Sequence, residues 1–482
     1  MSQPRRLGKG GRIDRMKSLK FTFNGKTYQG YEGDTLASAL IANDVQVVGR
    51  SFKYHRPRGI FSCGSDEPNA IVQLEEGAYT EPNTLATRIE LYEALKAKSQ
   101  NCWPSVDFDI NEINSFFSRL LPAGFYYKTF MWPPKLWMWY ESKIRKAAGM
   151  GISPMENDPD NYEQVHAHCD VLVVGAGPAG LAAALAAGRT GARVMLVDEQ
   201  AEMGGALLGE NTDTEIDGLP AMDWVAKALA ELADMPEVRI LPKTTLSGYY
   251  DYNWLSALER VTDHMGPGNG STLPRQRFWK IRARQVVLAT GAIERPLVFA
   301  DNDRPGVMLA GAVRTYIIRY GVLPGKNMVV FTNNDSAYLT AIDAARAGGK
   351  VTVVDGRQSP TGDLVKQADG LGVHVIPGSV ITGVTGKKGI TSVQVMELGE
   401  DGKSLRGSAA NLHCDLVAMS GGWNPTVHLF SQSRGKLRWD EGKIMFVPTV
   451  AAPTNPNVSA GCCNGTMDLP GILAEGMTAG SQ

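Results

Sequence analysis

The sequence predicts an α/β protein preceded by a smaller α+β domain, and three stretches support this prediction. Asp170–Gln200 reads as an apolar strand, a glycine-rich turn, an alanine-rich helix and a second apolar strand. Lys326–Asp355 repeats the strand–helix–strand order. Leu19–Asn43 holds two short strands joined by Asn24-Gly25 and then a helix beginning after Asp34-Thr35. The first two stretches predict Rossmann-type units, and the third predicts the start of a ferredoxin-like β-grasp domain.

Length and charge limit the class of protein. The 482 residues leave room for two or three domains, and the net charge of -1 gives no basic surface for nucleic acid or a membrane. The six cysteines form no CxxC pair, so we predict no metal site, and their scatter favours the cytoplasm. The basic residues of segment 1–17 lack an apolar core, so this segment is a solvated arm or a docking arm rather than a secretory signal.

The glycine-rich turn of the first unit has the spacing of a dinucleotide-binding loop, Gly175 to Gly180. Gly175 allows a tight turn, Gly177 lets the backbone approach a pyrophosphate, and Gly180 lets helix and strand pack closely. Pro178 suits the first helical turn, whose free amides attract phosphate. Asp198, 18 residues past Gly180, or its neighbour Glu199 would accept hydrogen bonds from a ribose.

Further small residues mark the same predicted site. Gly204-Gly205 lets the backbone pass the adenosine side of the ligand, and Thr245 follows the third strand, where the adenine is met. Ala289-Thr290-Gly291 resembles the small-residue crossing of two-dinucleotide flavoproteins, and the stretch around Gly422 resembles a crossing in glutathione-reductase-like proteins. Such flavoproteins carry Asp for the FAD ribityl chain where Cys462 follows Gly461 here. We therefore predict NAD rather than FAD in this site.

The predicted cofactor-binding residues are Gly175, Ala176, Gly177, Pro178, Ala179, Gly180, Asp198, Glu199, Gln200, Gly204, Gly205, Thr245, Ala289, Thr290, Gly291, Gly422, Gly461 and Cys462. No acid–base pair or nucleophile stands out, so we predict no catalytic residue in this chain; flavin bound to another chain would do the chemistry.

The second Rossmann-type unit lacks a glycine loop. Thr332–Ala337 reads TNNDSA, so side chains occupy the space of a pyrophosphate and Asp335 adds a repelling charge. We predict a degenerate site that binds no dinucleotide. Further along the chain, Cys414–Met419 is a predicted strand, and there the chain is expected to return to the first dinucleotide domain.

Two N-terminal stretches leave alternatives open. A plant-type cluster needs four cysteines, but the expected cluster loop, Arg50–Gly64, contains only Cys63, so we predict a ferredoxin-like fold without a cluster. Its basic part, Lys53–Arg58, is either a solvated loop or a site for an anion or partner. Glu81–Ser99 is expected to be helical. The aromatic-rich Trp103–Gly151 packs either within this chain or against another subunit.

These observations give five predicted parts. They are a basic arm, 1–17; the β-grasp domain, 18–100; the aromatic-rich connection, 101–165; the dinucleotide-binding domain, 166–305 with 411–482; and the inserted Rossmann-like domain, 306–410.

Six stretches resemble the α subunits of heterotetrameric sarcosine oxidases, and together they extend along most of the chain. They are Gly10–Arg15, Gly33–Leu40, Ser51–Gly59, Ser65–Ala70, Asp198–Gln200 and Asn334–Tyr338. The resemblance implies a subunit that assembles with β, γ and δ subunits. It also implies an amine substrate, sarcosine, demethylated to glycine, formaldehyde and hydrogen peroxide. NAD would lie in the first Rossmann domain of this chain, FMN at the interface with the β subunit, and FAD in that partner.

The resemblance leaves other functions open. Family α subunits usually continue into a folate-binding domain that is absent from these 482 residues, so we expect a fragment or a subunit that needs something C-terminal or in trans. Related proline, opine or N-methyl amino acid dehydrogenases have similar α subunits. A self-contained FAD-dependent NAD(P)H reductase is a further alternative, and so is a scaffold that has lost its ligands; the intact Gly175–Gly180 loop argues against the scaffold.

Overall fold

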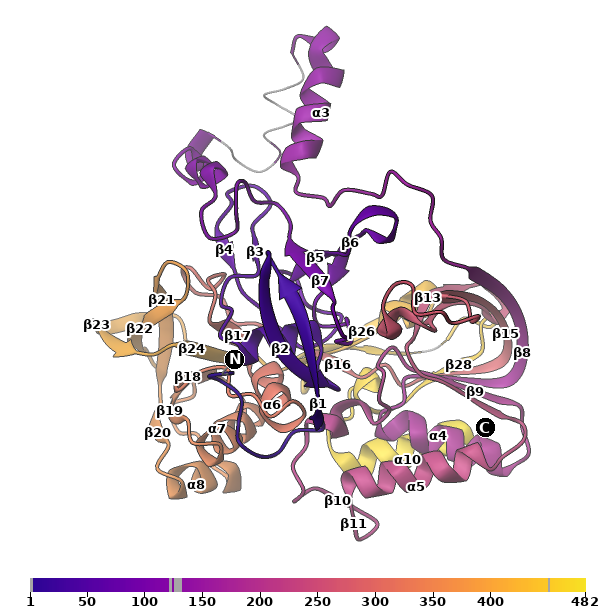
Figure 1. Cartoon of the computed structure of the whole chain (residues 1–482). Helices are drawn as coiled ribbons and strands as arrows, with labels where there is room; N and C mark the ends of the chain where they lie inside the picture. The colour runs from indigo at the N-terminus through magenta and orange to yellow at the C-terminus, as the bar shows by residue number, and fades with distance from the viewer. Residues whose placement is uncertain (1–2, 121–123, 125–131, 450) are drawn as a thin grey trace. The chain divides into compact units, whose positions relative to one another are not determined.

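The computed structural model describes residues 3–120, 124, 132–449 and 451–482 (Figure 1). The chain divides into two compact units. Unit 1 consists of Met1–Pro159 and Pro296–Gly421, and unit 2 consists of Asp160–Arg295 and Gly422–Gln482. Across the described ranges, no helix is long and apolar enough to span a membrane.

The N-terminal part of unit 1 contains the predicted β-grasp sheet, with strand order β2-β1-β7-β5-β6. The hairpin turns at Asn24-Gly25, where both residues have positive φ, 52° and 77°, as the predicted turn requires. Thr35 caps the helix that follows through a reciprocal pair of hydrogen bonds with Ser38. The elements are β1 (Asp14–Phe23), β2 (Lys26–Glu32), α1 (Leu36–Ala42), β3 (Gly49–Arg50), β4 (Pro57–Arg58), β5 (Ile71–Leu74), η1 (Gly77–Tyr79), β6 (Glu81–Leu85) and β7 (Lys96–Ser99).

The expected helix over Glu81–Ser99 is wrong. This stretch supplies two strands, β6 and β7, separated by turns. β7 pairs in parallel with β1 and antiparallel with β5, and thereby closes the sheet. Contacts distant in sequence decide the conformation of this segment, which no local periodicity reveals.

The aromatic-rich connection forms short helices. They are η2 (Ile110–Ser115), η3 (Ser118–Leu120), η4 (Pro134–Leu136) and α3 (Trp137–Ala147). Figure 1 shows α3 labelled in this segment. Four aromatic residues of this segment lie outside the described residues: Phe125, Tyr126, Tyr127 and Phe130.

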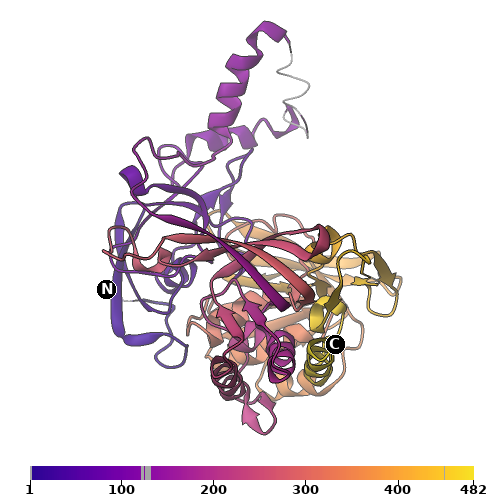
Figure 2. The same ribbon diagram turned by 90° about the vertical axis from the view of Figure 1, so that its right-hand side faces the viewer.

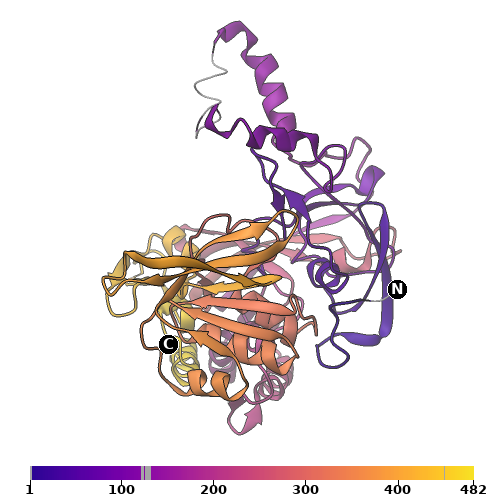
Figure 3. The ribbon, with the colours of Figure 1, turned by 90° about the vertical axis from the view of Figure 1, so that its left-hand side faces the viewer.

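The remainder of unit 1 is a five-stranded parallel sheet of order β17-β24-β18-β19-β20. One face packs on helices, and the other on a three-stranded antiparallel sheet (Figure 3). The strands are β17 (Val307–Leu309), β18 (Asn327–Thr332), β19 (Lys350–Asp355), β20 (His374–Ile376), β21 (Ser379–Gly386), β22 (Ile390–Leu398), β23 (Leu405–His413) and β24 (Leu416–Ser420), and the helices are α6 (Ala310–Ile318), α7 (Ser336–Arg346) and α8 (Asp363–Gly370).

This sheet corrects the expected place of one strand. From its sequence, Cys414–Met419 is expected to be a strand of the first dinucleotide domain. Instead, β24 pairs with β18 from Met328↔Leu416 to Thr332↔Ser420, so it belongs to the second sheet. The apolar sequence of this strand fits either parallel sheet, so only the observed pairing shows to which sheet it belongs.

Unit 2 carries the first dinucleotide fold, with sheet order β12-β9-β8-β15-β14-β13 and β28 beside β15. Figure 2 shows the long strands β8 and β15, which pair in parallel. The sheet strands are β8 (Tyr162–Val174), β9 (Val194–Val197), β12 (Val238–Leu241), β13 (Thr244–Tyr250), β14 (Trp254–Arg260), β15 (Gln276–Leu288) and β28 (Asn457–Ser459).

Helices and small hairpins complete unit 2. They are α4 (Pro178–Arg189), η5 (Gly205–Gly209), β10 (Glu215–Ile216), β11 (Leu219–Pro220), α5 (Ala221–Ala233), η6 (Asp251–Asn253), η7 (Asp263–Met265), β16 (Ala292–Glu294), β25 (Trp423–Pro425), α9 (His428–Gln432), β26 (Leu437–Asp440), β27 (Met445–Pro448), η8 (Gly461–Asn464) and α10 (Leu469–Gly480). The C-terminal helix α10 lies against α4 so closely that a Cβ atom at Gly476 would approach the Ala179 carbonyl oxygen to 2.2 Å.

Candidate nucleotide-binding site

The glycine loop between β8 and α4 has the geometry that its sequence predicts. Gly175 has φ +98°, and a Cβ atom there would lie 2.4 Å from the Ala289 carbonyl oxygen. A Cβ atom at Gly180 would lie 1.8 Å from the Gly175 carbonyl oxygen. Both distances are far below van der Waals contact, so only glycine fits, and the loop stays close to the end of β15.

A second backbone segment approaches the loop from η5. Gly205 has φ +56°, and a Cβ atom there would lie 2.7 Å from the Gly177 Cα atom. Gly177 immediately precedes α4 and, as a glycine, offers no side-chain cap. Pro178 occupies the first turn of the helix, where its missing N–H costs no helical hydrogen bond. The first-turn amides of a 12-residue helix are thus held beside glycine backbone, the arrangement in which helices bind phosphate.

Asp198 ends β9 and contacts the loop directly. One carboxylate oxygen accepts a hydrogen bond from the Ala176 backbone amide at 2.7 Å, and the other accepts one from the Gln200 amide at 2.8 Å. The residue is 8% exposed. Asp198 therefore braces the loop as well as standing where a ribose carboxylate was predicted. Glu199 accepts at its main-chain carbonyl from Arg260, at 3.1 Å.

The end of β9 also meets the start of β13. The Thr244 amide donates to the Asp198 carbonyl at 2.7 Å, and the Lys243 amide donates to the Gln200 carbonyl at 2.9 Å. These bonds place the start of β13, which includes Thr245, beside the acidic turn; the contact of Thr245 with an adenine stays a prediction.

Thr290, Gly291 and Gly422 form a separate group near β16 and β25. The Thr290 hydroxyl donates to the Thr426 carbonyl at 2.7 Å, and the Thr426 amide donates to the Gly291 carbonyl at 3.0 Å. The Gly422 carbonyl accepts from the Arg295 amide at 2.8 Å. Their hydrogen bonds thus join the β16–β25 pair, whereas Ala289 contacts the glycine loop.

Gly461 and Cys462 begin η8, beside α4. Gly461 has φ +73°, and a Cβ atom there would lie 3.0 Å from the Ala179 Cβ atom. Burial raises the pKa of the Cys462 thiol to about 11, so this side chain is uncharged at neutral pH. It offers no carboxylate to the ribityl hydroxyls of a flavin.

Glu475, on α10, holds η8 in place and was missed by the sequence analysis. Its carboxylate accepts from the Gly461 amide at 2.8 Å, from the Asn464 side-chain amide at 3.3 Å, and from the Thr466 hydroxyl. No sequence signal pairs these residues, because the contact depends on how α10 packs beneath the loop.

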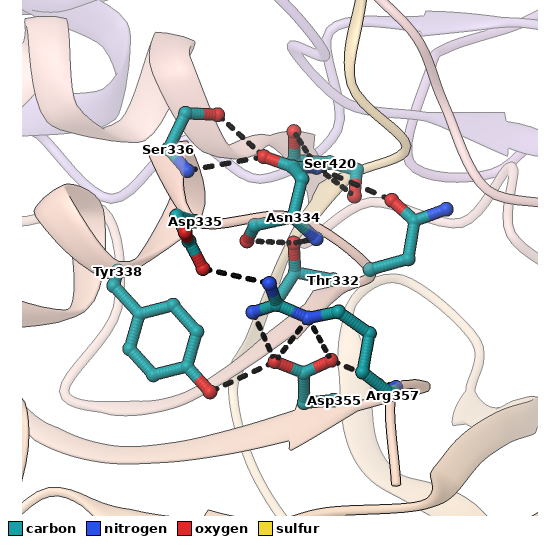
Figure 4. Close-up of polar contacts among 9 residues, drawn as sticks. Thr332, Asn334, Asp335, Ser336, Tyr338, Asp355, Arg357 and Ser420 are labelled. Carbon is teal, nitrogen blue, oxygen red and sulfur yellow. Dashed lines mark hydrogen bonds and ion pairs between the residues drawn. The ribbon is translucent and has the colours of Figure 1, made fainter. Parts of the chain in front are cut away.

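Side chains fill the corresponding loop of the second Rossmann-type sheet (Figure 4). The Asn334 amide nitrogen donates to the Ser420 carbonyl at 3.1 Å, and its oxygen accepts from the Ser336 amide at 3.1 Å. The amide of Asn334 itself donates to the Thr332 hydroxyl at 3.0 Å. These bonds connect the ends of β18 and β24 with the start of α7, at the edge where a parallel sheet receives a dinucleotide.

Arg357 closes the same edge from the end of β19, and it too was missed by the sequence analysis. Its guanidinium donates to the fully buried Asp355 at 2.8 Å and to Asp335 at 2.7 Å. The Tyr338 hydroxyl donates to Asp355 at 2.9 Å, and burial raises the pKa of this phenol. The Asp355 carboxylate, which follows the strand as a ribose ligand would, already has partners within the chain.

Most basic residues near the expected cluster loop are bound within unit 1. Arg50 donates to Glu112 at 3.0 Å, and His55 lies 2.7 Å from Asp109, with both histidine and aspartate buried. Arg56 and Arg58 both pair with Asp303. These contacts give the segment a structural role, which favours neither a solvated loop nor an anion site.

Two family matches support the two predicted parts of the fold, the N-terminal domain and the dinucleotide-binding domain. Residues 169–462 match the family described as "Pyridine nucleotide-disulphide oxidoreductase", and residues 16–102 match the family described as "2Fe-2S iron-sulfur cluster binding domain". The predicted order of a ferredoxin-like domain followed by a dinucleotide-binding fold is thereby confirmed.

Three curated relatives are named as the alpha subunits of sarcosine oxidases. The protein of Rhizobium meliloti (strain 1021) is 49% identical over 92% of this chain, and that of Corynebacterium sp. (strain P-1) is 42% identical over 98%. The protein of Corynebacterium sp. (strain U-96) is 41% identical over 99%. The predicted resemblance is confirmed. The chain covers 43%, 44% and 45% of these relatives, less than half of their length.

Among solved structures, the L-proline dehydrogenase from P. horikoshii has a similar fold. Its TM-score is 0.64 at 19% identity, covering 99% of this chain and 74% of that chain. An opine oxidase protein of Agrobacterium tumefaciens (strain Ach5) is 27% identical over 58% of this chain, and the match covers 57% of that protein.

Proposed function

Because the chain belongs to the pyridine nucleotide-disulphide oxidoreductase family, we propose that it is the α subunit of a flavin-dependent oxidoreductase that demethylates sarcosine. The match to sarcosine oxidase α subunits along 92% or more of the chain carries this proposal. The products would be glycine, formaldehyde and hydrogen peroxide, made in the cytoplasm by flavin held in partner subunits. This chain would bind and position a nucleotide without contributing a catalytic residue.

The nucleotide of unit 2 would be NAD in preference to FAD. Its pyrophosphate would lie over the start of α4, against the loop from Gly175 to Gly180 and the backbone of Gly204-Gly205. Asp198 or Glu199 would meet a ribose, with Gln200 and Thr245 on the adenine side. Since Cys462 is an uncharged thiol, the ribityl chain of FAD would lose its usual carboxylate partner, whereas NAD has no ribityl chain.

The remaining predicted ligands would line the other half of the cofactor. Ala289-Thr290-Gly291 and Gly422 lie in unit 2 beside β16 and β25, and Gly461 lies beside Ala179. Small residues there leave room for the ligand and would contact it through backbone groups.

The network at the second loop supports this function over a self-contained NAD(P)H reductase. Such a reductase needs a second open dinucleotide site. Here the Asn334 side chain and the Asp335–Arg357–Asp355 chain of ion pairs occupy that edge. Electrons would therefore come from the amine substrate in a partner subunit rather than from NAD(P)H bound to this chain.

The aromatic-rich segment would supply the surface for a partner subunit. Among its described residues, Trp103, Phe116, Trp132 and Trp139 each expose more than half of their surface, at 62%, 93%, 79% and 59%. Each aromatic buries ~150–250 Å² on contact, so together they offer several hundred Å², a large share of the ~800 Å² that each partner gives to a specific interface. We assign this surface to a β, γ or δ subunit, with FMN held at the β interface as the resemblance implies.

Coexpression with the candidate partner subunits tests the proposal. The purified assembly is expected to form hydrogen peroxide from sarcosine and to do so faster than from proline or an opine. This chain purified alone is expected to form none. Oxidation of proline or an opine in preference to sarcosine would identify the assembly as one of those related enzymes. NADH oxidation by this chain alone would contradict the subunit function.

A further inference from the structure

The N-terminal domain matches an iron–sulfur family but lacks the ligands for a cluster. A [2Fe–2S] cluster needs four thiolates, and the matched residues 16–102 contain Cys63 and Cys102 alone. Over the described positions, no group of three or more His, Cys, Asp or Glu side chains could hold a metal ion. The residues present therefore do not fit the cofactor for which the family is described.

Glu67 lies three residues after the expected cluster loop, Arg50–Gly64, and its carboxylate contacts backbone amides within that loop. One of its carboxylate oxygens accepts hydrogen bonds from the backbone amides of Phe61, at 2.8 Å, and Ser62, at 2.7 Å. The other oxygen accepts from the amides of Asn69, at 2.7 Å, and Ala70, at 3.1 Å. Glu67 is 4% exposed. Burial raises the pKa of this carboxyl group, and the four amides act in the opposite direction.

We infer that the Glu67 carboxylate replaces the iron–sulfur cluster as the acceptor around which this loop folds. Cluster loops direct backbone amides at the cluster sulfurs, so a loop that loses its cluster keeps inward-pointing donors without partners. A buried donor left without a partner destabilises the folded state, so such a loop is unstable unless another acceptor takes the place of the cluster sulfurs. Glu67 satisfies four such donors with one side chain.

The carbonyl groups of the same two residues, Phe61 and Ser62, contact the second domain of unit 1. The Phe61 carbonyl accepts from the Leu309 amide at 2.9 Å, and the Ser62 carbonyl accepts from the Tyr316 hydroxyl at 2.9 Å. Tyr316 is 1% exposed and belongs to the same apolar core as Phe21 of the β-grasp sheet. Phe61 and Ser62 thus connect Glu67 on one side with β17 and α6 on the other.

The loop consequently serves as a structural joint between the β-grasp domain and the second Rossmann-type domain. Gly59 adds a close approach, since a Cβ atom there would lie 2.9 Å from the Pro305 Cα atom. Ion pairs of Arg56 and Arg58 with Asp303 add further contacts between the two domains near β4. The domain then holds the second Rossmann-type domain in place, and no electron passes through it.

Hydrogen exchange of the unmodified chain gives the first test. Phe61, Ser62, Asn69 and Ala70 lie outside regular strands or helices, yet their amides are expected to exchange at least ~100-fold slower than those of an open loop. Exchange at open-loop rates would overturn the inference. This measurement needs no variant, so it tests the inference even if a substitution at Glu67 prevents folding.

Glu67→Gln provides the second test, with Glu76→Gln as the matched control. Glutamine keeps one acceptor oxygen and turns an NH₂ group towards two amide donors, whereas the Glu76 side chain is 72% exposed and bonded to Lys96. The Tm of Glu67→Gln is expected to fall by about 4 °C or more, and the four amides to exchange ~10-fold faster. A Tm and exchange rates equal to those of the control would overturn the inference.

A double-mutant cycle and a metal assay complete the design. Tyr316→Phe removes the bond on the other face of Ser62, and its effect on Tm should be less than additive with that of Glu67→Gln if the two faces are coupled; additive effects would contradict the joint. Iron and acid-labile sulfide in near-stoichiometric amounts in the purified chain would contradict the replacement itself.

Discussion

The carboxylate of Asp198 accepts a hydrogen bond from the backbone amide of Ala176 at 2.7 Å, which joins the end of β9 to the glycine loop. The sequence indicates Asp198 as a ribose ligand, and the structure gives the same side chain a second role in shaping the loop. The proposed nucleotide binding and the observed shape of the loop would therefore depend on the same residue.

Asp198→Asn is expected to weaken both functions of this residue. Asparagine can accept from the Ala176 amide or the Gln200 amide through one oxygen, so one buried donor loses its partner at a cost of about 1–3 kcal/mol. Nucleotide retained through purification should fall by at least ~10-fold, measured by chromatography of the acid extract. Asp213→Asn, exposed in the same unit, is the control and should retain the wild-type amount.

Gly180→Ala is expected to disrupt the loop more strongly. The added Cβ atom would lie 1.8 Å from the Gly175 carbonyl oxygen, so α4 and the loop must separate. We expect loss of bound nucleotide and a fall in the unfolding free energy of about 2 kcal/mol or more, measured by chemical denaturation. Gly370→Ala, in α8, meets open space and should be neutral or stabilising. Equal behaviour of the two variants would mean that the loop does not have this geometry.

Arg357→Ala tests the closed edge of the second sheet. Removing the guanidinium leaves the buried Asp355 with the Tyr338 hydroxyl and one backbone amide, so the unfolding free energy should fall by about 1–3 kcal/mol. Lys366→Ala breaks an exposed ion pair and should cost no more than about 0.5 kcal/mol. Neither variant should oxidise NADH; an NADH oxidase activity in Arg357→Ala would indicate that the second site is gated rather than lost.

The Cys462 thiol provides a pH-dependent signal. Its pKa is raised to about 11 by burial, above the ordinary value of 9.0, so the thiolate is scarce at pH 7. Alkylation by iodoacetamide, followed by mass spectrometry, should be slow at pH 7 and rise tenfold per pH unit up to about pH 11. Since the folded-state pKa exceeds the unfolded value, the folded state binds more protons between these values, and stability falls as pH rises from 9 to about 11. Rapid labelling at pH 7 would contradict a half-buried, uncharged thiol.

Local sequence rules predicted the parts of the fold that depend on backbone geometry. The Asn24-Gly25 turn, the Thr35 cap and the glycines at 175 and 180 each adopt the conformation that their residue types require. These features are decided within a few residues of chain, which is why one sequence suffices to find them.

The errors and omissions arise where tertiary contacts decide. Glu81–Ser99 becomes two strands because β7 pairs with β1 and β5, and β24 joins the second sheet because it pairs with β18. Glu475 contacts Gly461 from 14 residues along the chain, and Arg357 contacts Asp335 from 22. No sequence pattern links residues at either of these separations, so Glu475 and Arg357 could be identified as site residues only from the structure.

The nucleotide released on denaturing the purified chain tests the central proposal most directly. Mass spectrometry of the acid extract should find NAD in a near 1:1 ratio with protein and no FAD from this chain. FAD in that ratio would contradict the argument drawn from Cys462, and an extract without any nucleotide would contradict a binding site at the start of α4.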